Sequence, residues 1–389
     1  MSKPVIISAA RTPIGSFHGS LSSVAATRLG SIAISGALKQ LDLSGDGVDE
    51  VIMGNVLSAG LGQAPARQAG LGAGLPKSVG CTTVNKVCGS GLKAVMLASQ
   101  AIMSGDADVV VAGGMESMSN APYLLPKARS GYHMGHGEIV DSMIRDGLWD
   151  VYNQFHMGEA AELCAETLGI SREEQDQFAA TSYRRVLDAQ RRGDFRREIV
   201  SVRVSERQDG MIDEDEEPKR LALEKLPTLK PAFRNDGKIT AANASSISDG
   251  AAALVVMSEE KAKAIGLKPR ARIVGYTSFA TDPAWFSTAP SPAISALLRK
   301  SGREKTDIDL FEINEAFAAC SIAVNRELGL DPNKVNVRGG AVALGHPIGA
   351  SGARILTTLI HALEDLNLNS GIASLCIGGG EAVAMLIER

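Results

Sequence analysis

The chain is short of cysteine, aromatic residues and net charge, and the shortages of cysteine and of net charge each exclude a class of protein. Its five cysteines among 389 residues form an odd set without a CxxC pair, which argues against a disulfide framework and against a zinc site. Aromatic residues make up only 4% of the chain, and the formal net charge is -4. Because so small a charge creates no field that recruits polyanions, we expect no nucleic-acid partner and no anionic membrane surface.

The sequence also lacks a recognisable targeting segment. From Met1 it runs through Ser2-Lys3-Pro4 directly into the strand-like residues 5–8, without a signal peptide or an Arg-rich transit segment. We find no apolar stretch as long as a membrane span, so we expect no membrane partner. These absences, together with the unpaired cysteines, predict a protein of the reducing cytosol.

Glycine and small apolar residues are abundant instead. The chain holds 41 glycines and is 44% hydrophobic, a balance that favours close packing of helices on sheets. A chain of 389 residues exceeds the size of one ordinary core, so we expect two or three domains.

The composition and the residue pattern of the sequence change twice along the chain. At first, short Val- and Ile-rich runs such as Val51-Ile52-Met53 alternate with helical patterns, which predicts βαβ units and a mainly parallel sheet. A stretch rich in Tyr, Pro, His and charge follows, and then the first pattern returns. The predicted domains are an N-terminal core domain of residues 1–118 plus 250–270, an inserted loop domain of residues 119–249, and a C-terminal core domain of residues 271–389.

Two features of the inserted stretch predict local structure. Ser171 followed by Glu174 is a capping box, which predicts that a helix begins there. The acidic run Asp213-Glu214-Asp215-Glu216-Glu217 is typical of a solvated loop, because blocks of like charge are usually exposed.

The two core stretches repeat the same order of parts. In the first, Ser90-Gly91 opens an amphipathic helix, and the next strand runs to Gly113-Gly114. In the second, Ser351-Gly352 opens a helix, and the last buried strand runs through Cys376 to a run of three glycines. This repeat predicts two duplicated domains that face each other, with loops at equivalent strand ends converging on one site.

Cys88 stands directly before the first of these helices, in the motif Asn85-Lys86-Val87-Cys88-Gly89-Ser90-Gly91. Free N–H groups and the positive end of a helix dipole favour a thiolate there, which makes Cys88 a candidate nucleophile. A buried structural cysteine is the alternative on local grounds.

Three further residues at strand ends or in glycine-rich loops could serve such a nucleophile. His346 lies in an apolar, glycine-rich loop where an imidazole could act as a base, although a core histidine is the alternative. Cys376 ends a strand and is a second thiol, or merely a strand cysteine. Asn314 follows the strand 310–313, where its amide could hold an oxyanion or a water, or else cap a helix.

With these motifs in place, the chain resembles the thiolases, most closely the short-chain branch that acts on acetoacetyl-CoA. The resemblance spans nearly the whole chain, from Ser8-Ala9-Ala10-Arg11-Thr12-Pro13 to Cys376-Ile377-Gly378-Gly379-Gly380. It implies the thiolase fold, an α/β arrangement of αβαβα layers built from two duplicated βαβ-based core domains with an inserted loop domain.

The resemblance also implies roles for the catalytic residues. Cys88 would be the acylated nucleophile, His346 the base that activates it, and Cys376 the acid and base of the second half-reaction. Asn314 would hold a water that forms one oxyanion hole with His346, and the N–H groups of Cys88 and Gly378 would form the other.

By the same resemblance, coenzyme A lies against the loop domain. The implied contacts are Leu148, His156, Met157, Phe233, Ala241, Ser245 and Phe317, with Met157 narrowing the acyl pocket. The basic residue for the CoA phosphates falls near Glu217-Pro218-Lys219-Arg220, where the register is shifted, so Lys219 and Arg220 are both candidates and a solvated basic pair is the alternative. Met157 could equally be ordinary core.

The implied activity is the reversible condensation of two acetyl-CoA to acetoacetyl-CoA plus CoA, through an acyl-Cys88 intermediate and with ping-pong kinetics. The alternatives are a broad-range 3-ketoacyl-CoA thiolase of fatty-acid degradation and a non-catalytic acyl-CoA- or lipid-binding relative. The Cys376-Ile377-Gly378-Gly379-Gly380 block argues against a ketoacyl synthase. The resemblance further implies a homotetramer, acyl-CoA substrates, and neither a metal nor a redox cofactor.

Overall fold

The computed structural model describes residues 2–41, 45–205 and 210–389. The strands are β1 (Pro4–Arg11), β2 (Gly15–Ser16), β3 (Glu50–Gly54), β4 (Gly80–Val84), β5 (Val109–Ser117), β6 (Tyr123–Leu124), β7 (Val140–Asp141), β8 (Trp149–Asp150), β9 (Phe155–His156), β10 (Val202–Arg203), β11 (Met211–Ile212), β12 (Ser248–Ser258), β13 (Ala271–Ala280), β14 (Leu310–Ile313), β15 (Ser370–Ile377) and β16 (Glu381–Glu388). The α-helices are α1 (Ala26–Lys39), α2 (Pro65–Gly72), α3 (Ser90–Ser104), α4 (Met157–Thr167), α5 (Arg172–Arg192), α6 (Glu259–Ala264), α7 (Pro290–Ser301), α8 (Ala318–Leu328), α9 (Ala341–Leu344) and α10 (Ser351–Asp365).

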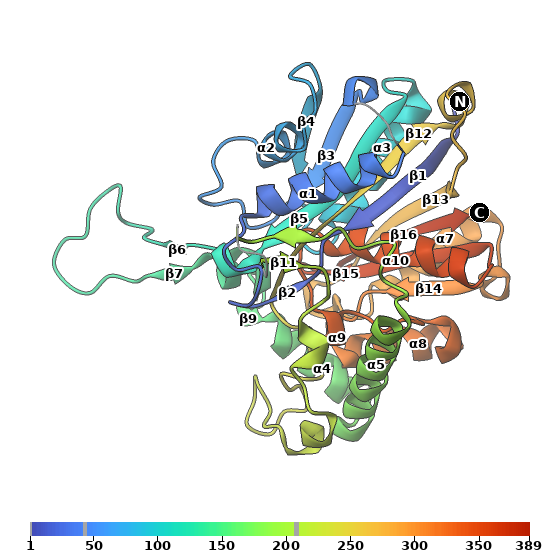
Figure 1. Ribbon diagram of the computed structural model, residues 1–389. Helices are drawn as coiled ribbons and strands as arrows, with labels where there is room; N and C mark the ends of the chain where they lie inside the picture. Colours follow the sequence, from blue (N-terminus) through green and yellow to red (C-terminus); the bar gives the residue numbers. More distant parts are fainter. Residues whose placement is uncertain (1, 42–44, 206–209) are drawn as a thin grey trace.

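The main strands form one long sheet in the order β14-β15-β16-β13-β1-β12-β5-β3-β4 (Figure 1). The parallel pairing predicted for the first 118 residues or so is confirmed for β3–β4 and β3–β5, but it does not extend to the whole sheet. Among the described strands, β14–β15 is the one further parallel pair, whereas β12 runs antiparallel to both β1 and β5, and β16 to both β13 and β15. The parallel pairs are those joined through helices. Strand β16, which the sequence reading passed over, returns from β15 through the three-glycine turn and therefore has to be antiparallel.

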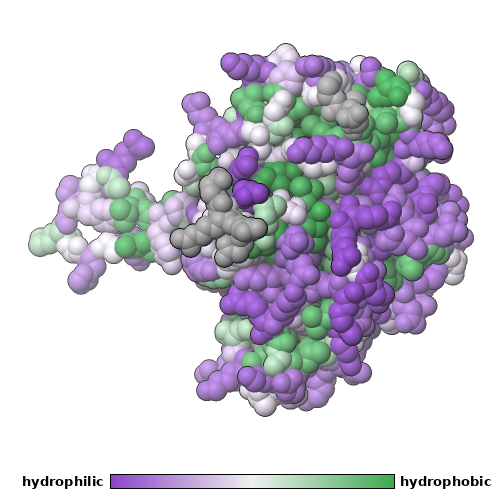
Figure 2. All heavy atoms as spheres, viewed as in Figure 1, coloured by the Kyte–Doolittle hydropathy of each residue, from purple (hydrophilic) through white to green (hydrophobic). Residues whose placement is uncertain are grey.

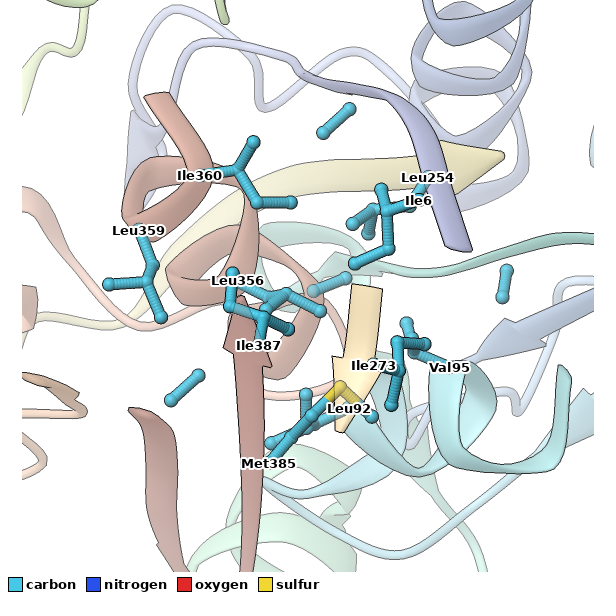
Figure 3. Packing of buried hydrophobic residues seen from close by; sticks show 14 of the residues in the cluster. Ile6, Leu92, Val95, Leu254, Ile273, Leu356, Leu359, Ile360, Met385 and Ile387 are labelled. Carbon is cyan, nitrogen blue, oxygen red and sulfur yellow. The ribbon is translucent and has the colours of Figure 1, made fainter. Parts of the chain in front are cut away.

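Helices and the two halves of the sheet stack as the expected αβαβα layers. Helices α3 and α10 form the middle layer, because one apolar cluster joins their side chains to strands of both halves. Figure 3 shows Leu92 of α3 and Leu356 of α10 beside Ile273 and Met385 of the C-terminal half. A second cluster joins α1 and α2 to the outer face of the N-terminal half, and a third joins α7 to the outer face of the C-terminal half.

The N-terminal ends of α3 and α10 pack with backbone against backbone. A β-carbon on Gly91 would lie 2.8 Å from the backbone nitrogen of Ala353, and one on Gly352 would collide with the backbone nitrogen of Leu92. The repeated Ser-Gly pair therefore has a steric cause, since only glycine permits this approach at both positions.

Helix α3 also corrects the expectation that the sequence has no stretch as long as a membrane span. Residues 87–104 reach 18 residues with a mean hydropathy of 1.2. In the fold, this stretch includes the middle-layer helix, which contacts α10 and both halves of the sheet. Its apolar character is therefore that of a core helix.

The inserted segment packs against helices α8 and α9 of the C-terminal half through α4 and α5. The predicted capping box is confirmed, because Ser171 Oγ accepts a hydrogen bond from the Glu174 N–H and the Glu174 carboxylate accepts one from the Ser171 N–H. Between β6 and β7 the chain projects far from the body of the molecule (Figure 1). The domain boundaries predicted from the sequence stay a prediction.

The acidic run is not simply a solvated loop, and that expectation is wrong for its second half. Asp215 is buried and receives two hydrogen bonds from the Arg11 guanidinium, at 2.7 and 2.9 Å. Glu216 accepts hydrogen bonds from the N–H groups of Ser16 and Ser20. The run therefore ties the inserted segment to the turn after β1, because buried carboxylates are stable only with such partners.

We predict that Gly352→Ala lowers the free energy of unfolding by about 1–3 kcal/mol, because the added methyl group collides with the backbone of α3. Urea unfolding followed by circular dichroism measures the change. Gly80→Ala is the matched control, since a β-carbon there meets nothing within 4 Å. Equal urea midpoints for the two variants would contradict the steric account.

Candidate active site

A cavity of about 720 Å³ opens between the inserted segment and the ends of the core strands. Every residue predicted for the site lines it except Asn314 and Lys219. Its walls come from both core halves and from the insertion, as the predicted convergence of strand-end loops requires. The lining residues are Phe17, Cys88, Met118, Gly147, Leu148, His156, Met157, Tyr183, Glu217, Arg220, Leu221, Leu229, Ala232, Phe233, Thr240, Ala241, Ala242, Ala244, Ser245, Ser246, Ile247, Phe286, Ala316, Phe317, His346, Ile348, Cys376 and Gly378.

Cys88 sits on a strained turn between β4 and α3. The residue before it, Val87, has a φ of 45°, which is costly for a β-branched side chain. Ser90 Oγ fixes the turn by accepting a hydrogen bond from the Lys86 N–H at 2.8 Å and donating one to the Val87 carbonyl at 2.6 Å. Asn85 Oδ1 accepts from the Val87 N–H at 2.9 Å. These hydrogen bonds stabilise the strained turn and so hold the Cys88 thiol at the cavity wall.

The Cys88 thiol is protonated at neutral pH. Burial raises its pKa to about 11, and the Glu116 carboxylate contributes in the same direction. The N–H groups of Gly378 and of Cys88 itself point at the sulfur and oppose this shift. These N–H groups do favour the thiolate, as the sequence predicts, but in the free protein burial outweighs them. A base has to remove the proton during the reaction.

His346 is buried, lines the cavity and has its ring held on both sides. Its Nδ1 lies 2.6 Å from Ser351 Oγ, whose own hydroxyl donates to the Pro347 carbonyl at 3.0 Å. We therefore assign the hydrogen to Nδ1, which leaves Nε2 as the acceptor. The Asn314 Nδ2 donor, 3.5 Å from Nε2, fits this assignment.

The imidazole of His346 is neutral in the free protein. Burial lowers the pKa of His346 to about 3, and the buried Arg354 guanidinium contributes in the same direction. Thiol and imidazole thus form an uncharged pair at neutral pH, not a resting thiolate–imidazolium pair.

Asn314 lies behind His346 at the end of β14 and does not cap a helix, since α8 begins only at Ala318. Its Oδ1 is buried, and no group among the described residues donates a hydrogen bond to it. A buried carbonyl oxygen without a protein donor is a site where a water binds.

Glu116 clamps the His346 loop to the ends of β3 and β5. Its carboxylate accepts hydrogen bonds from Asn55 Nδ2 and from the N–H groups of Val56, Leu57 and Gly349, at 2.8 to 3.2 Å. Burial raises its pKa to about 7, while these donors favour the ionised form. The loop therefore depends on one buried carboxylate that the sequence reading did not single out.

Cys376 is the second thiol of the cavity. It is buried at the end of β15, and burial raises its pKa well above the usual range, with the Cys88 sulfur as a further cause. Cys88 and Cys376 both line the cavity. Cys164 and Cys320 belong to the same apolar cluster as Cys376.

Aromatic rings line the cavity toward the acyl end. The His156 imidazole stacks on Phe233 with centroids 4.9 Å apart, and Phe317 meets the edges of Phe233 and Phe286 at 6.3 and 6.4 Å. His156 also caps α4, because its Nδ1 accepts a hydrogen bond from the Gly158 N–H at 3.0 Å. Met157, the first residue of that helix, is buried against this wall.

The two candidate basic residues, Lys219 and Arg220, differ in their position relative to the cavity. Arg220 lines the cavity, whereas Lys219 forms an ion pair with Glu214 and is absent from the wall. The remaining predicted contacts, Leu148, Ala241 and Ser245, all line the cavity.

Sequence reasoning missed several wall and support residues. Ser351 was noted only as part of the repeat, although its place five residues after His346 at a helix start was an available signal. Phe286 carries no local motif, because only the tertiary fold brings it to the cavity, whereas Ile348 lies two residues after His346 in the glycine-rich loop.

Two family models match the chain, and together they cover nearly all of it. They are "Thiolase, N-terminal domain" over residues 4–260 and "Thiolase, C-terminal domain" over residues 267–389. The chain belongs to the thiolase family. The resemblance stated from the motifs is therefore confirmed.

Similar proteins of known name extend the match to full length. An acetyl-CoA acetyltransferase of Schizosaccharomyces pombe is 53% identical over 387 residues, covering 99% of this chain and 98% of the relative. The crystal structure of the Bacillus anthracis acetyl-CoA acetyltransferase superposes with a TM-score of 0.97 at 46% identity, covering 100% and 99% of the two chains. The Acat5 thiolase from Ascaris suum, in complex with coenzyme A, gives a TM-score of 0.95 at 47% identity, with both chains covered completely.

We predict that alkylation of Cys88 by iodoacetamide accelerates steadily between pH 7 and pH 10. Below a pKa of about 11 the thiolate fraction grows about tenfold per pH unit, whereas an ordinary thiol with a pKa of about 8.5 levels off above pH 9. Mass spectrometry of the Cys88 peptide gives the rate, and Cys88→Ser controls for the site. A plateau near pH 8 would contradict the neutral pair.

Proposed function

We propose that this thiolase is an acetyl-CoA acetyltransferase, which condenses two acetyl-CoA to acetoacetyl-CoA plus CoA and catalyses the reverse thiolysis. The observation that carries the proposal is the meeting of Cys88, His346, Cys376 and the Gly378 N–H at one cavity. The full-length similarity to acetyl-CoA acetyltransferases supports the same reaction.

In the first half-reaction, Cys88 takes the acetyl group from acetyl-CoA. His346 Nε2 accepts the thiol proton as the sulfur attacks the thioester carbonyl, and the proton then passes to the departing CoA sulfur. The neutral resting pair suits this order, because charge separation occurs only when the carbonyl oxygen develops negative charge. The N–H groups of Cys88 and Gly378, which already point at the sulfur, are in place to bind that oxygen.

In the second half-reaction, the Cys376 thiol first passes its proton to His346 Nε2, and the resulting thiolate removes an α-proton from another acetyl-CoA. The enolate oxygen would accept a hydrogen bond from the proton now on His346 Nε2 and from a water on Asn314, whose buried amide oxygen has no donor among the described residues. The enolate carbon attacks the acyl carbon on Cys88, the carbon–carbon bond forms, and the Cys88 sulfur leaves and takes the proton from His346. A ping-pong pattern follows, since CoA departs before the second acetyl-CoA reacts.

The proposal of short-chain substrates is supported by three bulky side chains of the cavity wall. Met157, Phe286 and Phe317 are buried and line the same cavity as Cys88 and Cys376, where they would limit the length of an acyl chain. A broad-range 3-ketoacyl-CoA thiolase is the alternative activity, and a non-catalytic binding relative is the alternative from another class.

The assembly and the compartment are part of the proposal. The segment between β6 and β7 projects from the body and carries exposed apolar side chains, including Leu125, Tyr132, Met134 and Ile139 (Figure 2). Exposed apolar residues on such an arm suit a subunit contact, so we propose a homotetramer. We place the protein in the cytosol and expect no resident metal or redox cofactor, because acid–base chemistry and CoA thioester substrates suffice.

We predict that the wild type cleaves acetoacetyl-CoA with CoA far faster than it cleaves 3-oxo-octanoyl-CoA, and that Cys88→Ala lowers the rate at least about a thousandfold. Assays of both substrates and of 2-methylacetoacetyl-CoA measure this, with CoA binding to Cys88→Ala as the control for folding. Equal turnover of the eight-carbon substrate would favour the broad-range alternative. Absence of turnover with every substrate would favour a binding relative.

We predict that Arg220→Ala raises the KM for CoA roughly fivefold and leaves kcat unchanged, because an exposed cation at the mouth contributes about 1 kcal/mol to phosphate binding. Lys219→Ala is the matched control and should leave the KM as it is, since Lys219 pairs with Glu214. The reverse ranking of the two variants would assign the phosphate contact to Lys219.

A further inference from the structure

The two N–H groups proposed to bind the thioester oxygen come from different turns of the chain. The Cys88 N–H belongs to the turn between β4 and α3, and the Gly378 N–H to the turn between β15 and β16. How well the two N–H groups bind the oxyanion depends on the angle and distance between these turns, because an oxyanion donor acts only from a narrow range of positions.

Hydrogen bonds of Ser90 and Asn85 fix the first turn internally, but they do not set its position relative to the second turn. In the first, Val87 is held at a φ of 45°, a conformation that persists only when the surroundings impose it. In the second, Gly379 and Gly380 have φ values of 91° and 83°, and a β-carbon on Gly379 would meet nothing within 4 Å. The second turn is therefore open at Gly379, whereas the Gly380 carbonyl accepts a hydrogen bond from the Thr281 N–H at 2.7 Å.

One ion pair joins the two turns. Lys86 Nζ contacts Glu381 Oε2, and the two side chains are 23% and 37% exposed. Lys86 lies two residues before Cys88, and Glu381 lies three residues after Gly378, at the start of β16. On the other side of Cys88, Gly89 packs closely against Ile377 of the second turn. The pair and this packing thus hold the two turns at two separate points.

We propose that the Lys86–Glu381 ion pair is a positioning device that sets the Cys88 and Gly378 N–H groups for the oxyanion. The inference rests on the proposed function, since it assigns the pair a role in that reaction. Lys86 is absent from the residues that line the cavity, so it acts through its turn and not by touching the substrate.

The test uses the full-length protein and thiolysis of acetoacetyl-CoA. Lys86→Met and Glu381→Gln should each lower kcat about tenfold, with the KM for CoA within twofold of wild type. The thermal midpoint should barely move, because partly exposed ion pairs contribute little to stability. The matched control is Glu388→Gln, which removes an ion pair with Arg303 at the other end of β16 and should leave kcat unchanged.

Exchanging the two charges of the ion pair distinguishes a positioning role of the pair from an effect of losing either side chain alone. The double variant Lys86→Glu with Glu381→Lys restores the pair in the opposite sense and should regain most of kcat, and Lys86→Arg should keep it. Wild-type kcat in both single variants would overturn the inference, as would loss of kcat without recovery in the exchanged variant. An inactive wild type would instead overturn the proposed function, so the two failures are distinguishable.

Discussion

The close approach of α3 and α10 is the constraint on which the rest of the structure depends. Both helices begin with Ser-Gly, and each glycine lies against the backbone of the other helix. Their first turns are thereby brought together in the middle layer. The Cys88 turn leads into one helix and the His346 loop into the other, so the packing that forms the core also unites the nucleophile with its base.

The serines of the two Ser-Gly pairs, Ser90 and Ser351, orient the groups of the proposed active site. Ser90 fixes the strained turn before α3, and Ser351 fixes the tautomer of His346 before α10. Glu116 completes the arrangement by binding the N–H of Gly349 in the His346 loop. Buried polar groups that are fully satisfied rigidify a site, and here each one contacts a turn and not the proposed substrate.

Much of this could be predicted from the sequence, because the decisive signals are local. Cys88 before a helix, His346 in a glycine-rich loop and the repeated Ser-Gly pairs are patterns within short stretches. What could not be predicted depends on pairing at long range. The strand pattern indicated βαβ units, but the antiparallel partners β12 and β16 follow from topology. The buried partner of Asp215 is Arg11, some two hundred residues away, and the raised Cys88 pKa reflects burial that no motif encodes.

The order of strands has a consequence for folding during synthesis. Strand β1 lies in the centre of the sheet, between β12 and β13, and its residues pair with Leu254 and Arg272, among others. The first strand to leave the ribosome therefore waits for about 270 residues before both its edges are covered. Its unpaired backbone and apolar side chains are exposed throughout this interval, a state that is prone to aggregation. Nascent chains of this protein consequently depend on shielding of their N-terminal segment until the middle of the sheet can close.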